Sequence, residues 1–157
     1  MKLVINEPPI PQSRPRFNSQ NKRAYEKSNI KSYKQRVGYA ARKEFKKPIE
    51  RDIPLEINMK FYMPIPQYLS KVKKNRLMLE KEVKYVTKKP DLDNLLKAIL
   101  DGLNDIAYFD DGQVAKLSVE KVYSFNPRTD IEIKVIKENK HENTRQYSNE
   151  NSRQSKR

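Results

Sequence analysis

Apolar residues recur at helical spacing in two stretches of the chain. In the first stretch, residues 28–47, one face collects Ile30, Tyr33, Val37, Ala40, Ala41 and Phe45. In the second stretch, which starts near Asp93, one face collects Leu95, Leu96, Ile99, Leu100 and Leu103. Such spacing brings apolar side chains onto one side of a helix. The pattern therefore predicts two amphipathic helices, the first capped by Ser28 and ended by Pro48.

Apolar and polar residues alternate in other stretches, most regularly in residues 54–63. Alternation of this kind is typical of a strand with one buried face. The predicted strands cover residues 2–6, 54–63, 106–109, 113–124 and 129–137. The order of helices and strands predicts an α+β (mixed α/β) domain, in which one small mixed sheet packs with two main helices.

The chain of 157 residues is long enough for one domain, which we expect to span residues 1–137. Residues 138–157 contain few apolar side chains, so we expect a disordered polar tail there. Only 36% of all residues are hydrophobic, which predicts a small core. Because a small core buries little apolar surface, the domain is expected to gain stability from a partner subunit.

The composition is strongly basic, with a formal net charge of +14. A protein of this charge favours a polyanionic partner such as nucleic acid. The chain has no Cys, and its one His, His141, falls in the polar tail, which argues against zinc and thiolate metal sites. There is no apolar run of transmembrane length and no secretory signal, so we expect a cytoplasmic protein without a membrane partner.

Basic residues concentrate in two segments that are candidates for DNA contact. The first is an irregular arm or weak hairpin at residues 8–27, where basic and aromatic residues are interleaved. The second is the segment 71–89, interpreted as a mobile loop with a short helix near residues 69–82 that Leu77 and Leu79 anchor. The candidate DNA-binding residues are Arg14, Arg16, Lys22, Arg23, Lys71, Lys73, Lys74, Arg76, Lys88 and Lys89. A solvated arm and a disordered insertion are the alternatives.

Acidic residues in this basic chain gather around the second helix. Pro90 disfavours helix at the residue before it, so the chain is expected to reach Asp91 in an extended conformation. If it stays extended to Asp93, the two side chains point to the same side and can hold one hard cation. Asp93 or Asn94 then caps the helix. A second acidic pair follows at Asp110-Asp111. Carboxylates without His or Cys favour Mg²⁺, with Mn²⁺ as a substitute.

Simpler explanations exist for the same residues. Acids in the first turn of a helix stabilise its dipole, and Asp93 with Lys97 has the spacing of an i,i+4 ion pair. Asp111-Gly112 is typical of a tight turn with positive φ. A calcium-binding loop is excluded, because Leu95 occupies a position that needs an oxygen ligand. The residues alone leave a metal site and a helix cap both open.

The acids belong to a longer motif made of four pieces of sequence. These are Pro90-Asp91-Leu92-Asp93-Asn94-Leu95-Leu96-Lys97, Asp101-Gly102-Leu103, Asp110-Asp111 and Gln113-Val114. The motif closely resembles that of the RusA family of Holliday junction resolvases, strongly over residues 88–117 and more loosely from the first strand to the last. The resemblance implies that Asp91, Asp93 and Asp111 bind Mg²⁺. It also implies that Lys97 is required for cleavage. The essential acid of the family aligns with Asp111, and the role of Asp110 stays open.

The resemblance further implies a homodimeric, Mg²⁺-dependent endodeoxyribonuclease that resolves four-way DNA junctions by paired phosphodiester hydrolysis, in DNA recombination and repair. No nucleotide cofactor is expected. The three aspartates are expected to meet where the second helix and the following hairpin come together, with Lys97 stabilising developing negative charge. Two other classes stay open. One is a non-catalytic basic DNA-binding protein, and the other is a DxD nucleotide-sugar transferase, which small size and positive charge disfavour.

Overall fold

The computed structural model describes residues 1–13, 16–18 and 23–137, and for residues 16–18 and 23–25 it describes the backbone alone. The predicted disordered tail, residues 138–157, lies outside the described residues, as do Arg14 and Lys22 of the arm. No helix in the described ranges is both long and apolar enough to cross a bilayer.

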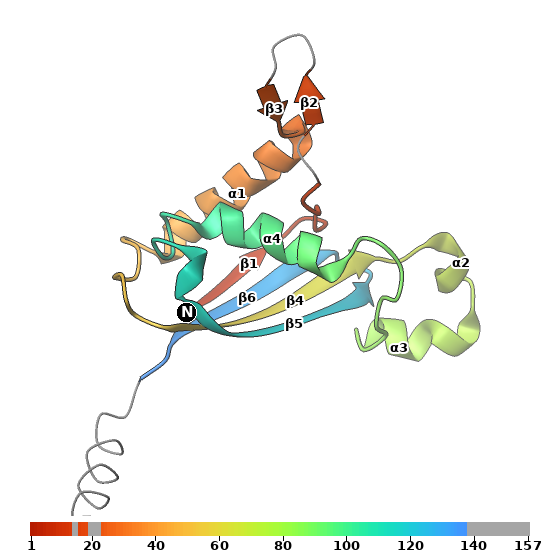
Figure 1. The fold of residues 1–157 in the computed structure, drawn as a ribbon. Coiled ribbons are helices and arrows are strands. Elements are labelled where there is room, and N and C mark those ends of the chain that lie inside the picture. Colours follow the sequence, from red (N-terminus) through yellow and green to blue (C-terminus); the bar gives the residue numbers. More distant parts are fainter. Residues whose placement is uncertain (14–15, 19–22, 138–157) are drawn as a thin grey trace, which may run out of the picture.

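Four strands form one mixed sheet, as the sequence predicted. They are β1 (Lys2–Ile5), β4 (Leu55–Pro64), β5 (Val114–Ser124) and β6 (Arg128–Val135), in the spatial order β1-β6-β4-β5. β4 pairs in parallel with β5 and antiparallel with β6, and β6 pairs antiparallel with β1. Because β4 and β5 are parallel, the chain between them must return from one end of the sheet to the other. The helix α4 (Leu92–Leu103) makes that return (Figure 1).

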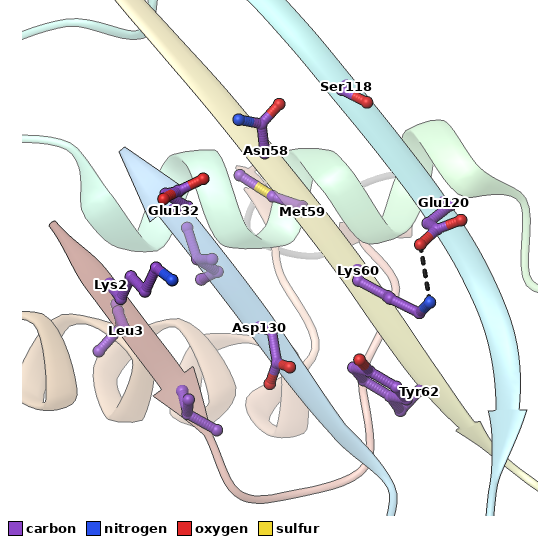
Figure 2. Close-up of a pocket in the computed structure, with 12 residues that line it drawn as sticks. Lys2, Leu3, Asn58, Met59, Lys60, Tyr62, Ser118, Glu120, Asp130 and Glu132 are labelled. Carbon is purple, nitrogen blue, oxygen red and sulfur yellow. Dashed lines mark ion pairs between the residues drawn. The ribbon is translucent and has the colours of Figure 1, made fainter. Parts of the chain in front are cut away.

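The sheet buries one face and leaves the other open. The buried residues of β4 include Leu55, Ile57, Met59 and Phe61, and the residues between them are only partly covered. Both long helices, α1 (Ser28–Glu44) and α4, lie over the buried face (Figure 1). The open face carries charged side chains such as Lys60 and Glu120, which form an ion pair of 2.8 Å (Figure 2). The alternation in the sequence therefore identified the buried face of β4 correctly.

The two long helices pack closely because glycines face each other at their crossing. A Cβ on Gly38 would lie 3.2 Å from the carbonyl oxygen of Gly102, and a Cβ on Gly102 would lie 3.0 Å from the Cβ atom of Val37. The apolar stripe of α4 is fully buried at Leu95 and Ile99, as predicted. Close packing on one side fixes how α4 is rotated about its own axis. That rotation determines the direction in which its polar face points.

The first long helix ends close to the predicted position but begins differently. Its N-cap is Lys27, and no side chain makes a capping hydrogen bond. The predicted Ser28 cap is therefore wrong, because Ser28 is already the first helical residue. The helix ends at Glu44, before Pro48, since a proline disfavours helical geometry in the residue that precedes it.

The segment after α4 turns back on the helix instead of forming the strand predicted at residues 106–109. The N–H groups of Ile106 and Ala107 donate to the carbonyl oxygen of Leu103 at 3.1 and 2.9 Å. Tyr108 is fully buried and makes only isolated bridges. N–H groups that bond to the end of a helix cannot also pair with a neighbouring strand, so the predicted strand does not form.

The basic segment between β4 and α4 is folded, although the sequence suggested a mobile loop. It contains α2 (Gln67–Ser70), the 3₁₀ turn η1 (Lys73–Asn75) and α3 (Arg76–Glu80). Leu79 is buried, as predicted, whereas Leu77 is 60% exposed and is not an anchor. Glu82 joins this segment to the sheet, because its two carboxylate oxygens each accept a hydrogen bond from Arg128 at 2.9 Å.

The basic arm forms the predicted weak hairpin, in which β2 (Arg16–Asn18) pairs antiparallel with β3 (Arg23–Tyr25). The hairpin leads directly into α1 and projects beyond the sheet (Figure 1). Before the hairpin, the N–H of Gln12 donates to the carbonyl oxygen of Asn94 at 2.8 Å. The base of the arm therefore lies beside the N-terminus of α4.

Candidate active site

Asp91 and Asp93 stand at the N-terminus of α4. Asp91 is the N-cap, with an extended backbone (φ −69°, ψ 144°), and Asp93 lies in the first helical turn. The predicted caps, Asp93 and Asn94, are wrong because the helix begins earlier, at Leu92. The Asp91 side chain makes no capping hydrogen bond, and both aspartates are exposed. Both side chains are therefore open to solvent at the positive end of the helix dipole.

Lys97 follows Asp93 by one helical turn and is also exposed. The ion pair that this spacing allows does not occur among the ion pairs of the described residues. Asp101, one turn further along, pairs instead with Lys34 of α1 at 2.7 Å. The ammonium of Lys97 therefore shares a helix face with Asp93 without being bound to it, which weakens the explanation of this pair as a surface salt bridge.

The second acidic pair lies at the 3₁₀ turn η2 (Asp111–Gln113), which leads into β5. Asp110 caps this turn: its Oδ1 accepts the N–H of Gly112 at 2.7 Å, and its own N–H donates to Oε1 of Gln113. No glycine in the described ranges has a positive φ, so the predicted tight turn of that kind is wrong. Both acids are exposed, but they differ in role, since Asp110 caps the turn and Asp111 does not.

Asp111 lies at the opposite end of α4 from Asp91. A helix of 12 residues, the length of α4, spans about 18 Å. At its C-terminal end, Tyr108 donates its hydroxyl to the carbonyl oxygen of Leu100 at 3.1 Å. Burial raises the pKa of Tyr108, and the negative charge of Asp111 raises that pKa further. Asp111 is therefore close to Tyr108 and to this end of the helix.

The pairing of the strands also indicates that Asp111 and Asp91 lie far apart. Val114, which follows Asp111 closely in the chain, pairs with the first residue of β4. Lys121 pairs with a residue near the end of β4, and its ammonium donates to the carbonyl oxygen of Pro90 at 2.6 Å. The strand between Val114 and Lys121 covers about 23 Å. The expectation that the three aspartates meet within one chain therefore does not hold, because α4 and β5 keep their ends apart.

The carboxylate pair at the N-terminus of α4 fits a divalent metal in its chemistry. Among the described residues, no three Asp, Glu, His or Cys side chains lie close enough together to hold a metal ion. Asp91 and Asp93 nevertheless offer hard carboxylate oxygens, and Mg²⁺ is commonly held by one or two carboxylates together with phosphate oxygens and water. The pair suits Mg²⁺ or Mn²⁺, and one chain alone leaves the predicted set of three aspartates incomplete.

Exposed basic side chains gather at the Asp91 end of the molecule. Lys88 and Lys89 directly precede the carboxylate pair, and both are exposed. The exposed candidates on the segment from α2 to α3 are Lys71, Lys73, Lys74 and Arg76, and this segment lies at the same end of the sheet (Figure 1). Arg16 and Arg23 lie on the paired strands β2 and β3. The structure therefore brings the segment 71–89 to the end of the molecule that carries Asp91, while the paired strands of the arm project beyond α1 (Figure 1).

Lys121 is a neighbour of the site that the sequence analysis did not single out. It occupies a position of β5 between Val119 and Tyr123, which both pack against the core. Side chains two residues apart in a strand share one face, so Lys121 also points toward the helices. A lysine at an inward position of an alternating strand is the signal that identifies it in the sequence.

Comparisons with known proteins agree with the motif. The family model described as Endodeoxyribonuclease RusA matches residues 6–134. A Bacillus subtilis (strain 168) protein named Uncharacterized protein YqaN is 34% identical over 138 residues, which are 87% of this chain and 96% of that protein. A Lactococcus phage r1t protein named Crossover junction endodeoxyribonuclease rusA is 32% identical over 92 residues, which are 58% of this chain and 62% of the phage protein. The range matched by the family model contains both long helices and the acids at both ends of α4.

Proposed function

The chain belongs to the RusA family of endodeoxyribonucleases, and on that premise we propose that it cuts four-way (Holliday) DNA junctions by paired hydrolysis of phosphodiester bonds, in DNA recombination and repair. The observation that carries the proposal is the exposed pair Asp91 and Asp93 at the N-terminus of α4, with Lys97 one turn away. The net charge of +14 supports a nucleic-acid substrate. No nucleotide cofactor is needed for this hydrolysis.

Asp91 and Asp93 are proposed to hold Mg²⁺, for which Mn²⁺ substitutes. When bound, Mg²⁺ supplies charge neutralisation at the scissile phosphate and lowers the pKa of water. Lys97 acts separately from the metal ligands. Its ammonium is proposed to stabilise the negative charge that develops on the phosphate, or to orient the attacking water. An ammonium has no lone pair, so Lys97 is not itself a ligand.

The third carboxylate is proposed to reach this site from a second copy of the chain. Within one chain, α4 keeps Asp111 away from Asp91 by about the helix length of 18 Å. In a twofold-symmetric homodimer every contact occurs twice. If Asp111 of the partner subunit meets Asp91 and Asp93, the reciprocal contact forms a second, equal site. Two equal sites suit the two nicks that resolve a junction, and the contact adds buried surface to a small core.

The basic residues of the arm and of the segment 71–89 are proposed to hold the DNA backbone. Support for this role comes from the segment 71–89, where the exposed candidates lie at the Asp91 end of the molecule: Lys71, Lys73, Lys74, Arg76, Lys88 and Lys89. Lysine and arginine contacts to phosphate release counterions, so junction affinity should fall steeply as salt concentration rises. Such contacts position the DNA and carry no base specificity.

A labelled four-way junction tests the proposed function. We expect Mg²⁺ or Mn²⁺ to support paired nicks that yield linear duplex products, and EDTA to abolish them. A linear duplex of the same sequence is the control, and it should stay largely uncut. A protein that binds the junction tightly but leaves it uncut with both metals is instead a non-catalytic DNA-binding protein.

A further inference from the structure

Lys121 of β5 places its ammonium group beside the backbone that leads into Asp91. Its Nζ donates to the carbonyl oxygen of Lys88 at 2.8 Å and to that of Pro90 at 2.6 Å. Lys121 is partly buried, and it takes part in no ion pair among the residues that the structure describes. The charge of this lysine is therefore directed at two backbone carbonyls just before the carboxylate pair.

The segment 84–90 runs along the outer edge of β5, which is the last strand of the sheet. The N–H of Tyr123 donates to the carbonyl oxygen of Lys84 at 2.9 Å, and the N–H of Val86 donates to the carbonyl oxygen of Lys121 at 3.1 Å. After Val86 this backbone pairing with β5 stops in the described structure. From there to the start of α4, the two hydrogen bonds from the Lys121 side chain connect the segment to the strand.

The contact with Pro90 acts on Asp91 through a single peptide plane. The carbonyl group of Pro90 is coplanar with the N and Cα atoms of Asp91. Holding that oxygen therefore sets the position of the Asp91 Cα and the direction in which its side chain leaves the backbone. A hydrogen bond from an ammonium group is stronger than one between neutral groups, so it suits a segment without sheet pairing.

We propose that Lys121 is a positioning residue that aims the Asp91 carboxylate at the metal ion. The inference rests on the proposed function, because that function makes Asp91 a metal ligand. Lys121 acts through the backbone and does not bind the ion itself, since an ammonium group cannot be a ligand. Groups that orient metal ligands typically change metal affinity or activity by 10–100-fold when they are altered.

Three variants separate positioning from general loss of structure. Lys121→Met removes the donors and keeps the length of the side chain, while Lys121→Arg keeps donors at the same place. Lys60→Met is the matched control, because Lys60 lies on the neighbouring strand, is partly buried and also makes a 2.8 Å contact, with Glu120 (Figure 2). Its side chain is on the open face of the sheet and does not approach the backbone before Asp91.

Three measurements are made on each full-length variant. Hydrogen exchange of a peptide covering residues 88–95, in EDTA, reports the order of the segment without metal. Titration with Mn²⁺ alone reports metal affinity without DNA. The Mg²⁺ concentration for half-maximal junction nicking reports the apparent Mg²⁺ affinity of the enzyme bound to DNA. For Lys121→Met we expect faster exchange in this peptide and a rise of about tenfold or more in both metal constants. Lys121→Arg should recover most of each change, and Lys60→Met should leave all three near wild type.

Metal constants for Lys121→Met that match those of wild type would overturn the inference, even if its thermal stability falls, because the lysine would then only fasten the chain. Equal effects in Lys60→Met would overturn it as well. If wild-type protein neither binds Mn²⁺ nor nicks a junction, the proposed function fails and the role of Lys121 toward a metal fails with it. If the wild-type protein is active and Lys121→Met behaves like wild type, the proposed function stands and this inference alone is wrong.

Discussion

Asp91→Asn, Asp93→Asn and Asp111→Asn are each expected to slow Mg²⁺-dependent nicking of a four-way junction by about 10³-fold or more, because an amide binds Mg²⁺ poorly and the lost charge stabilisation is worth several kcal/mol. Junction affinity in EDTA should stay the same or rise, since each change removes a negative charge near the DNA. Both quantities are measured on the same labelled junction, so binding and chemistry are separated directly.

Asp105→Asn is the matched control for these three variants. Asp105 is an exposed aspartate between α4 and η2, with φ of 61°, a conformation that asparagine also tolerates. The control makes the same change in charge, and it should nick at close to the wild-type rate. Near-normal nicking by the three variants would show that the metal site is misplaced. A loss of binding in EDTA would show instead that these acids only stabilise the fold.

Lys97→Met is expected to slow nicking by about 10²-fold while Mn²⁺ binding is largely kept, because the ammonium stabilises developing charge and is not a ligand. The rate is measured with protein in excess over the junction, so that weaker DNA binding does not contribute. Lys134→Met, an exposed lysine of β6 paired with Glu132, is the control.

A second result would give Lys97 a different role. If Lys97→Met nicks normally once the junction is saturated, and the slope of log affinity against log salt falls by about one unit, Lys97 is a phosphate contact only. In that case the negative charge of the transition state must be stabilised by other groups of the site.

The regular helices and strands could be predicted because the spacing of apolar residues in the sequence follows the positions that are buried. β4 alternates between buried and partly covered residues, and the apolar stripe of α4 matches its buried face. The helix caps could not be predicted in the same way, because a cap depends on which residue the helix begins at. Leu92 rather than Asn94 begins α4, and this shift of one half turn moves Asp93 from the cap into the helix.

The candidate residues could be named from the motif, but their arrangement could not. The chain between Leu103 and Asp111 is long enough, if extended, to run back along α4 toward Asp91. In the structure, hydrogen bonds from Ile106 and Ala107 to Leu103 turn this segment at the helix end instead. The sequence pattern is compatible with both paths, so the separation of Asp111 from Asp91 emerges only in the folded chain.

That separation is the basis of the central claim, that Asp91 and Asp93 of one chain share a site with Asp111 of the partner subunit. The claim requires a dimer, so light scattering at micromolar concentration should give twice the chain mass of 18.6 kDa. It also makes Asp91→Asn and Asp111→Asn complementary. A dimer with one chain of each kind holds one site with both changes and one site with neither.

The most direct measurement is junction nicking by that mixed dimer, made by expressing the two variants together with different affinity tags and purifying through both. We predict nicking at about half the wild-type rate per dimer, with single nicks in place of paired cuts, because one of two symmetric sites is intact. Each variant expressed alone should be inactive. If the mixed dimer is as inactive as the separate variants, each chain must complete its own site, and the claim of a shared site is contradicted.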